Sequence, residues 1–247
     1  EAQYMKNPQS QLSKSIKQLN AHFRLAMTGT PIENHLLDIW NLFDFTMPNY
    51  LGSKKQFELL LDTGSKDIIK AKLKPFILRR EKKEVLDSLP EKTEIILKCP
   101  LSEMQTQLYK TVLEATKKGI LQAKKSKNKL HMLTALLKLR QVCTHPELIE
   151  ECKGTGVSSA KFDLLKEKCS ELIEENHKVV IFSQFTGMLD IIQDWTIREN
   201  INTERIDGSI TGKKRMEAVE RFQTSDTPTL FLISLKAGGV GINLTAA

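Results

Sequence analysis

The sequence contains no apolar run that could cross a lipid bilayer and no basic-then-apolar stretch of the kind that opens a secretory signal. Its longest apolar runs, such as residues 179–182 and 230–233, are far shorter than the roughly 18 residues that a spanning helix needs. These absences argue against a membrane protein and a freshly exported one, and we expect no membrane partner.

Cysteine is scarce, and no two cysteines form a C-x-x-C pair, which argues against a disulfide scaffold and a zinc cluster. A reducing, intracellular environment fits this usage best. Cys143, His145 and Cys152 could be considered as metal ligands, but their spacing matches no common zinc pattern. We therefore predict no metal-binding residues in this chain.

Phosphate-binding fingerprints are missing, because the chain has neither a P-loop G-K-[ST] nor a G-x-G-x-x-G string. Segment 237–243, AGGVGIN, does place three glycines after an apolar run, where backbone N–H groups could approach a phosphate. Taken alone, a tight turn is the simpler interpretation of these glycines.

Basic residues exceed acidic ones, 37 to 30, for a net charge of +7, which permits a polyanionic partner. Residues 70–83 contain seven basic side chains and one acidic side chain, and residues 117–129 contain six lysines and no acid. A solvated helix face or loop is the simpler interpretation of either run by itself.

The first third of the chain has the pattern of half an α/β unit. Helical spacing begins after Ser10, which can cap a helix. A short strand is predicted over Arg24–Thr28, followed by a tight turn at residues 28–31 and a helix over Leu36–Phe45. An irregular helical region follows.

The middle of the chain is predicted to be helical after one strand. That strand is expected at Thr93–Cys99, between two prolines. Ser102 and Gln105 resemble a capping box at the start of a long helical region that ends near His145. Residues 147–156 are predicted to form an exposed loop.

The last third alternates regularly between helix and strand. Helices are predicted at 162–173, 188–195 and 214–222, and strands at 178–182, 203–206 and 229–233. This succession indicates a parallel sheet with helices on both faces, and ligands of such sheets bind at the carboxyl ends of the strands. The residues at those ends are polar, small or basic: 183–184, 207–209 and 234–239.

Several motifs, in order and spacing, resemble the motor of the SWI/SNF-like ATPases, which are double-stranded-DNA translocases of helicase superfamily two. They are TGTPIEN (28–34), LRR (78–80), LRQVCTHPEL (139–148), IFSQF (181–185), RIDGSI (205–210) and ISLKAGGVGINLTAA (233–247). The opening EAQYMKNP (1–8) resembles the tail of that family's D-E-A-Q Walker B motif, in the form common among bacterial and archaeal members.

The resemblance implies an α/β fold of two RecA-like lobes with parallel sheets, the first incomplete, plus helical insertions. Residues 1–90 would be the C-terminal part of lobe 1, with a helical insertion and the linker. Residues 91–247 would be lobe 2, the helicase C-terminal domain, with an insertion at about 102–146 and an end before motif VI. The chain would then be a piece of a longer protein.

The resemblance also implies roles on the nucleotide side. Glu1 matches the Walker B glutamate that orients the attacking water, and Gln3 matches a residue that reports the nucleotide state. Thr28, Gly29 and Thr30 would couple hydrolysis to lobe movement, and a capping turn at the same place is compatible with that role. In lobe 2, Gly241 and Asn243 would lie near the γ-phosphate and the ribose.

By the same resemblance, the strand ends of lobe 2 would line a DNA strand. The residues expected there are Ser183, Gln184, Ser209, Ser234 and Lys236, while Arg79 and Arg80 would bridge lobe and linker or meet DNA. Hydroxyl and amide side chains suit phosphate contacts, which position a duplex without reading its sequence. For any single serine, a strand-end turn is an equally good interpretation.

The implied function is ATP-dependent movement along double-stranded DNA, with ATP and Mg²⁺ as cofactors and duplex DNA and DNA-bound proteins as partners. The expected location is the cytoplasm at a prokaryotic nucleoid, or a eukaryotic nucleus. The polypeptide lacks the Walker A lysine, the Mg²⁺ aspartate and the motif VI arginine, so we expect it not to hydrolyse ATP alone. A non-catalytic DNA- or protein-docking module on the second lobe is the alternative, and a nucleotide-binding metabolic enzyme is a weaker one.

Overall fold

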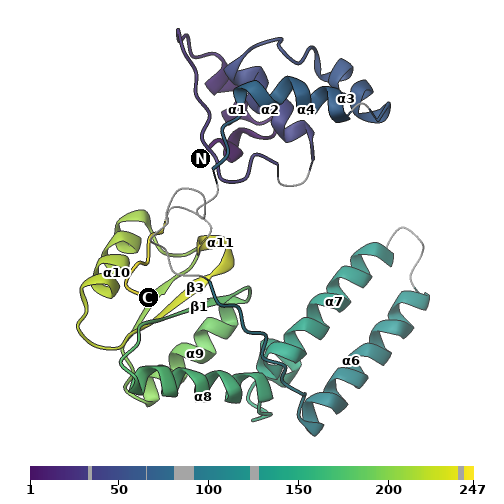
Figure 1. Ribbon diagram of the computed structural model, residues 1–247. Helices are drawn as coiled ribbons and strands as arrows, with labels where there is room; N and C mark the ends of the chain where they lie inside the picture. Colours follow the sequence, from purple (N-terminus) through teal and green to yellow (C-terminus); the bar gives the residue numbers. More distant parts are fainter. Residues whose placement is uncertain (33–34, 65, 81–91, 123–127, 239–241) are drawn as a thin grey trace. The chain divides into compact units, whose positions relative to one another are not determined.

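A computed structural model describes residues 1–32, 35–64, 66–80, 92–122, 128–238 and 242–247. The chain divides into two compact units, Glu1–Thr93 and Glu94–Ala247 (Figure 1). No helix among the described residues is both long enough and apolar enough to span a membrane.

All the secondary-structure elements among the described residues of unit 1 are helices. Its elements are η1 (Ala2–Met5), α1 (Gln11–Lys17), α2 (Leu37–Thr46), α3 (Lys54–Asp62), α4 (Lys66–Leu73) and η2 (Lys74–Phe76). Ser10 caps α1 by accepting a hydrogen bond from the Ser13 N–H, as the sequence predicts. Ser53 and Gln56 form a reciprocal capping box that starts α3.

The core of unit 1 forms where α2 lies against α3 and α4. Ile39, Trp40 and Phe43 of α2 pack with Phe57 of α3 and Ile69 of α4. These residues are apolar and lie at helical spacing, so each helix buries one stripe and leaves the rest of its surface in water. The helix predicted over Leu36–Phe45 is therefore confirmed as α2.

A buried amide fastens the N-terminal segment to α2. Asn41 is fully buried, and its Nδ2 donates to the Met5 carbonyl and, at 2.9 Å, to Ser13 Oγ. Its Oδ1 accepts from Lys17 Nζ at 2.6 Å, and Lys17 also pairs with Asp44. Every polar atom of this amide has a partner, so the burial carries no desolvation penalty for an unmade hydrogen bond.

The strand predicted over Arg24–Thr28 is wrong, because this segment has no regular secondary structure. A strand requires a hydrogen-bonded neighbour, and the described residues of unit 1 include no other strand. Within this segment, the Met27 carbonyl accepts a hydrogen bond from the Ala2 N–H at 2.9 Å. Phe23 and Leu25 are exposed.

Unit 2 combines a three-stranded sheet with long helices. Its elements are α6 (Glu103–Gln122), α7 (Asn128–Thr144), η3 (Pro146–Leu148), η4 (Glu150–Cys152), α8 (Ala160–Glu174), β1 (Val179–Ser183), α9 (Thr186–Arg198), β2 (Thr203–Ile206), α10 (Gly212–Thr224), β3 (Leu230–Ser234) and α11 (Leu235–Gly238). The strands are parallel and lie in the order β1-β3-β2.

The central strand separates two cores. On one face of β3, Leu230 and Leu232 pack against α8 and α9. On the other face, Phe231 and Ile233 pack against α10. All of β3 is buried because it has a strand on each edge and helices on each face. The predicted parallel sheet with helices on both faces is confirmed.

The helices α6 and α7 form a hairpin beside this α/β body (Figure 1). The predicted capping box is present, since the Gln105 N–H donates to Ser102 Oγ at 3.2 Å and Gln105 Oε1 faces the Ser102 N–H. The buried Gln105 side chain also donates to the Val142 carbonyl and accepts from the Ala160 N–H, each at 3.1 Å. One amide thus joins α6, α7 and α8.

Two further predictions, for residues 93–99 and 147–156, are wrong. Residues 93–99 form no strand, and Ile95 and Ile96 are exposed, because no strand among the described residues pairs with them. The segment 147–156 is not simply an exposed loop but contains η3 and η4. Ile149 and Cys152, three residues apart, are buried with Val142 against α6.

Candidate nucleotide and nucleic-acid sites

Three predicted nucleotide-side residues meet at the start of unit 1. The Gln3 side-chain NH₂ donates to the carboxylate of Glu1, and Thr28 Oγ1 donates to Gln3 Oε1 at 2.8 Å. The Glu1 carboxylate can only accept and the Thr28 hydroxyl donates, so the Gln3 amide has a single orientation that satisfies both hydrogen bonds. Glu1 is exposed, whereas Gln3 and Thr28 are half-buried. The structure therefore links an exposed carboxylate to a turn about 25 residues away in sequence.

Thr28 also closes its own turn. Its Oγ1 accepts from the Thr30 N–H at 3.1 Å, so the hydroxyl that donates to Gln3 orders the following backbone. The structure thus has the turn that we expected at residues 28–30, and this turn is compatible with the coupling role that the resemblance implies. Gly29 between them is exposed, and no atom lies within 4 Å of where its Cβ would stand, so space does not require glycine there.

The two predicted arginines reach a cavity that the same turn lines. Arg79 and Arg80 are exposed and line, with Thr28 and Gly29, a cavity of about 790 Å³ in unit 1. Arg24 lines it as well, and no acidic side chain does so among the residues described. The rest of the lining is largely apolar, and the Arg24 guanidinium donates to the Phe45 and Leu19 carbonyls, so the charge that this cavity offers to a ligand comes from Arg79 and Arg80.

Two of the predicted serines at strand ends of unit 2 are buried and serve their own turns. Ser183 Oγ donates to the Phe185 carbonyl at 2.9 Å and accepts from the Phe185 N–H at 3.1 Å. Ser234 Oγ accepts from the Ala237 N–H at 3.4 Å. These contacts match the strand-end turn interpretation, and phosphate contact by either hydroxyl stays a prediction.

The third serine belongs to an ionic cluster that the sequence analysis did not single out. Asp207 Oδ1 accepts from the N–H and the hydroxyl of Ser209, at 2.9 and 2.6 Å, while Arg205 bridges Asp207 and Asp190 at 2.8 and 2.7 Å. The hydrogen bonds from Ser209 lower the pKa of Asp207 most, and the Arg205 guanidinium lowers it further. The spacing Arg-x-Asp-x-Ser was the signal available in the sequence. Ser209 is exposed, but both of its donors face Asp207.

Gln184 and Lys236 are the predicted strand-end residues with exposed polar side chains. Lys236 has no carboxylate partner among the residues that the structure describes. Gln184 is held from outside its own loop, because its Oε1 accepts a hydrogen bond from the Arg140 guanidinium on α7. Sequence analysis missed Arg140, although it lies inside the motif at residues 139–148.

The predicted residues of the glycine-rich segment are only partly described. Asn243 is exposed, and its carbonyl accepts from Gln223 Nε2 at 2.8 Å. Gly241 lies outside the described residues. The nucleotide contacts expected of both therefore stay predictions.

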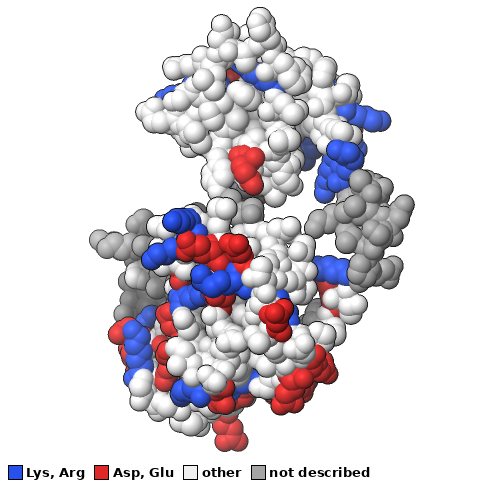
Figure 2. All heavy atoms as spheres, turned by 90° about the vertical axis from the view of Figure 1, so that its left-hand side faces the viewer, with Lys and Arg blue, Asp and Glu red and all other residues white. Residues whose placement is uncertain are grey.

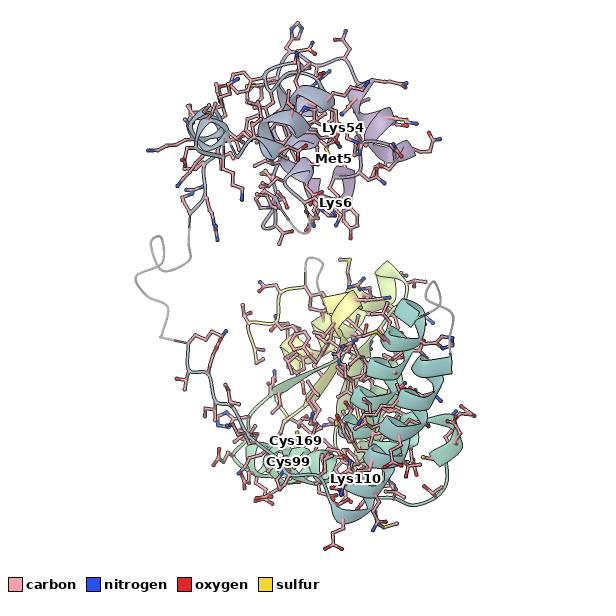
Figure 3. All side chains as sticks on the ribbon, turned by 90° about the vertical axis from the view of Figure 1, so that its right-hand side faces the viewer. Met5, Lys6, Lys54, Cys99, Lys110 and Cys169 are labelled. Atoms are coloured by element: carbon pink, nitrogen blue, oxygen red, sulfur yellow. The ribbon has the colours of Figure 1, made fainter. Side chains whose placement is uncertain are left out.

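Cys169 and His145 are engaged in packing. Cys169 lies in the interior of unit 2 (Figure 3), where burial raises the pKa of its thiol to about 11. His145 is buried, its Nδ1 accepts from the Glu147 N–H at 3.2 Å, and its ring contacts Phe162 edge-on. Burial lowers the pKa of His145. Within the described ranges, no three His, Cys, Asp or Glu side chains are arranged to hold a metal ion.

Charge is mixed over the face of unit 2 that Figure 2 shows, with lysines and arginines beside acidic side chains. Lys70, Lys72 and Lys74 of the first basic run are exposed in unit 1. The middle of the second run, residues 123–127, lies outside the description. This face does not show a continuous basic surface, which by itself would indicate nucleic-acid binding.

Comparison with family models gives two matches along the chain. The SNF2-related domain matches residues 1–148, and the helicase conserved C-terminal domain matches residues 160–247. Together they cover both units.

Several known proteins are similar over the whole chain. An uncharacterized ATP-dependent helicase of Mycoplasma pneumoniae is 39% identical over 100% of this chain and 24% of its own length. The human SWI/SNF-related matrix-associated actin-dependent regulator of chromatin subfamily A member 1 is 34% identical over 100% of this chain and 25% of its own. The chain thus spans about a quarter of the length of these curated relatives.

A solved structure is similar as well. The Sulfolobus solfataricus SWI2/SNF2 ATPase core in complex with double-stranded DNA superposes with a TM-score of 0.58 at 34% identity. The match covers 100% of this chain and 55% of that one. The predicted α/β fold class is confirmed by this likeness to an SNF2 ATPase core, and among the described residues the parallel sheet lies in unit 2.

Proposed function

The chain belongs to the SNF2-related helicase-like ATPases, and from this premise we propose that it is part of a motor that hydrolyses ATP to move along double-stranded DNA. Residues 1–90 would serve as the C-terminal part of the first lobe and residues 91–247 as the second lobe. ATP-driven closure and opening of the two lobes would shift the duplex by its backbone, a movement that does not require its strands to separate.

The observation that carries the proposal is the hydrogen-bonded chain from Glu1 through Gln3 to Thr28. An exposed carboxylate can orient the water that attacks a γ-phosphate. A movement of that carboxylate would be transmitted to Thr28, because the Gln3 amide cannot turn without breaking both hydrogen bonds. Such a link is what coupling hydrolysis to a conformational change requires. Asn243 would contribute on the nucleotide side of the second lobe, together with Gly241.

DNA would lie along the strand ends of unit 2. The exposed amide of Gln184 and the ammonium group of Lys236 suit phosphate oxygens. Ser183, Ser209 and Ser234 would act mainly by shaping these loops, since their hydroxyls are engaged in turns or with Asp207. Backbone contact implies little sequence preference and a steep fall of affinity with salt.

The family implies Mg²⁺ as well as ATP, and Mg²⁺ would neutralise phosphate charge during transfer. The described residues offer no cluster of carboxylates that could hold the ion. We therefore assign no step to it on this chain. For the whole protein we propose duplex DNA and DNA-bound proteins as partners, and a location at a nucleoid or in a nucleus.

The proposal is tested by the ATPase rate of the intact protein with duplex DNA, single-stranded DNA or RNA. Duplex DNA is expected to stimulate hydrolysis most, and a Glu1→Gln variant is expected to abolish the stimulation. Equal stimulation by single strands would favour a strand-separating helicase. Duplex binding without any stimulated hydrolysis would favour the docking module.

The 247-residue polypeptide alone is expected to release no phosphate from ATP above a Glu1→Gln control. Its sequence has no G-K-[ST] lysine to stabilise the transferring phosphoryl group, and such electrostatic stabilisation contributes several kcal/mol to the barrier reduction. DNA-stimulated phosphate release by this polypeptide would show the expectation to be wrong.

A further inference from the structure

Unit 2 contains a cavity of about 530 Å³ where α7 and α8 approach the end of β1. Arg140 of α7, Lys161 of α8 and Gln184 after β1 all line it. Among the described residues that line the cavity there is no carboxylate, although acidic and basic side chains are mixed over the visible face of the unit (Figure 2). Most of the lining side chains are apolar, and the two charged ones, Arg140 and Lys161, are both cations, so the charge at the mouth of the cavity favours an anion.

The fold brings these three side chains to one edge of the sheet. The helix α8 runs back along the sheet before β1 begins, so its first turn, with Lys161, lies at the end of β1 that carries Gln184. The cap residue of α8 is tied to α7, since Ser159 Oγ donates to the Thr144 carbonyl at 2.8 Å. Arg140 lies one turn before Thr144 and so faces the same edge.

The Arg140 guanidinium determines which end of the Gln184 amide faces solvent. A guanidinium has only donors, so it can bind only the carbonyl oxygen of the amide, Oε1. The NH₂ group of Gln184 is then directed away from Arg140, with its two N–H donors available. Phosphate oxygens are acceptors, so this is the orientation that a phosphate needs.

Both cations remain available for an anion. Arg140 and Lys161 are exposed, and neither has a carboxylate partner among the residues that the structure describes. The contact with Gln184 uses one of the five N–H donors of the guanidinium. By contrast, Lys168 on the same helix as Lys161 pairs with Glu171 at 2.7 Å.

We propose that Arg140, Lys161 and Gln184 form a subsite for a phosphate of the DNA backbone, in which Arg140 positions the Gln184 amide and both cations balance the phosphate charge. The α6–α7 hairpin thereby takes part in DNA binding through its second helix. This inference rests on the proposed function, since it extends the DNA path along the strand ends onto the hairpin.

The test is a double-mutant cycle on duplex affinity in the intact protein, measured over a series of salt concentrations. Arg140→Met and Gln184→Ala are each expected to weaken binding about tenfold. The double variant is expected to bind DNA no more weakly than the weaker of the two single variants, because losing Arg140 already removes the contact between the Gln184 amide and the phosphate. Lys161→Met is expected to reduce the slope of log affinity against log salt by roughly one.

Matched variants separate positioning from charge and from folding. Arg140→Lys is expected to retain the salt slope but not the coupling to Gln184, because an ammonium lacks the planar fork. Lys168→Met, the control on α8, is expected to leave affinity and slope unchanged. Each exposed variant is expected to melt at the wild-type temperature.

Two outcomes would overturn the inference. Additive losses of DNA affinity for the Arg140 and Gln184 variants would show that Arg140 does not position the amide. An Arg140→Met protein that binds DNA as tightly as Lys168→Met would show that these residues form no phosphate subsite. Failure of the proposed function looks different: the wild-type protein would then bind duplex DNA no better than other polyanions, and Gln184→Ala would change nothing.

Discussion

Single side chains in this protein hold together segments that lie far apart in sequence. Gln3 joins the side-chain carboxylate of Glu1 to Thr28, and Arg140 joins α7 to the loop after β1. Amide and guanidinium groups suit this purpose because their donors and acceptors are fixed in direction. Effects of substitutions at these positions should therefore be non-additive within each pair.

Thr28→Val is expected to lower the DNA-stimulated kcat of the intact protein about tenfold with little change in KM, because the hydrogen bond to Gln3 is lost. Gln3→Ala should have a similar effect, and the double variant should be no slower. Steady-state kinetics at saturating DNA measure this. Thr46→Val is the matched control, since the Thr46 hydroxyl bonds only carbonyls of its own helix. Additive losses would show that the two residues act independently.

His145 should make unit 2 less stable in mild acid. Burial lowers its pKa in the folded chain, so below the ordinary value of 6.5 the unfolded chain takes up the proton first. The contribution to stability is complete above pH 6.5 and is lost as pH falls toward the lowered folded pKa. Urea unfolding at a series of pH values measures it.

His145→Asn is the matched variant for that experiment. The Asn Oδ1 can still accept from the Glu147 N–H, but the side chain does not titrate. The wild-type loss of unfolding free energy between pH 6.5 and 5 should shrink in this variant. An unchanged pH dependence would assign the effect to other groups.

At the scale of elements, the helical hairpin is joined to the α/β body by polar contacts at its base. Gln105 bonds the backbones of α7 and α8, and Ser159 bonds the end of α7. Ile149 and Cys152 pack beside them against α6. The hairpin base is thus fixed at the place where Arg140 reaches Gln184.

Gln105→Leu is expected to lower the unfolding free energy by about 2–4 kcal/mol, because it leaves the Val142 carbonyl and the Ala160 N–H buried without partners. Urea unfolding followed by circular dichroism measures the change. Gln107→Leu, at an exposed position on the same helix, should change it by less than about 0.5 kcal/mol. Equal effects at both positions would contradict the assigned role of Gln105.

At the scale of the whole molecule, each unit has a hydrophobic core of its own. The core around Trp40 lies wholly within unit 1, and the core around Trp195 lies wholly within unit 2. Independent cores allow independent folding. The two tryptophans, one in each unit, make the units separately observable.

The polypeptide 94–247 is therefore expected to fold alone and to unfold cooperatively. Fluorescence of Trp195 in this polypeptide should give the same urea midpoint as the 247-residue chain carrying Trp40→Phe. A Trp195→Phe chain would report unit 1 in the same way. A polypeptide 94–247 without a cooperative transition would show that unit 2 depends on the preceding residues.

Local signals in the sequence determined the helices, their caps and the alternation from Ala160 to Ser234. A helix depends on neighbours within four residues, and the parallel sheet followed from strict alternation. The motif order was enough to indicate the family. All of these are readable without knowing which distant segments meet.

Tertiary structure decided what depends on distant partners. The segments 24–28 and 93–99 have strand-like sequences but no strand neighbour among the residues that the structure describes, and neither forms a strand. It also decided that Ser183 and Ser234 are buried in turns while Gln184 is exposed and held by Arg140. Strand pairing and side-chain exposure are set by contacts between residues far apart in the chain, and sequence spacing does not encode these contacts directly.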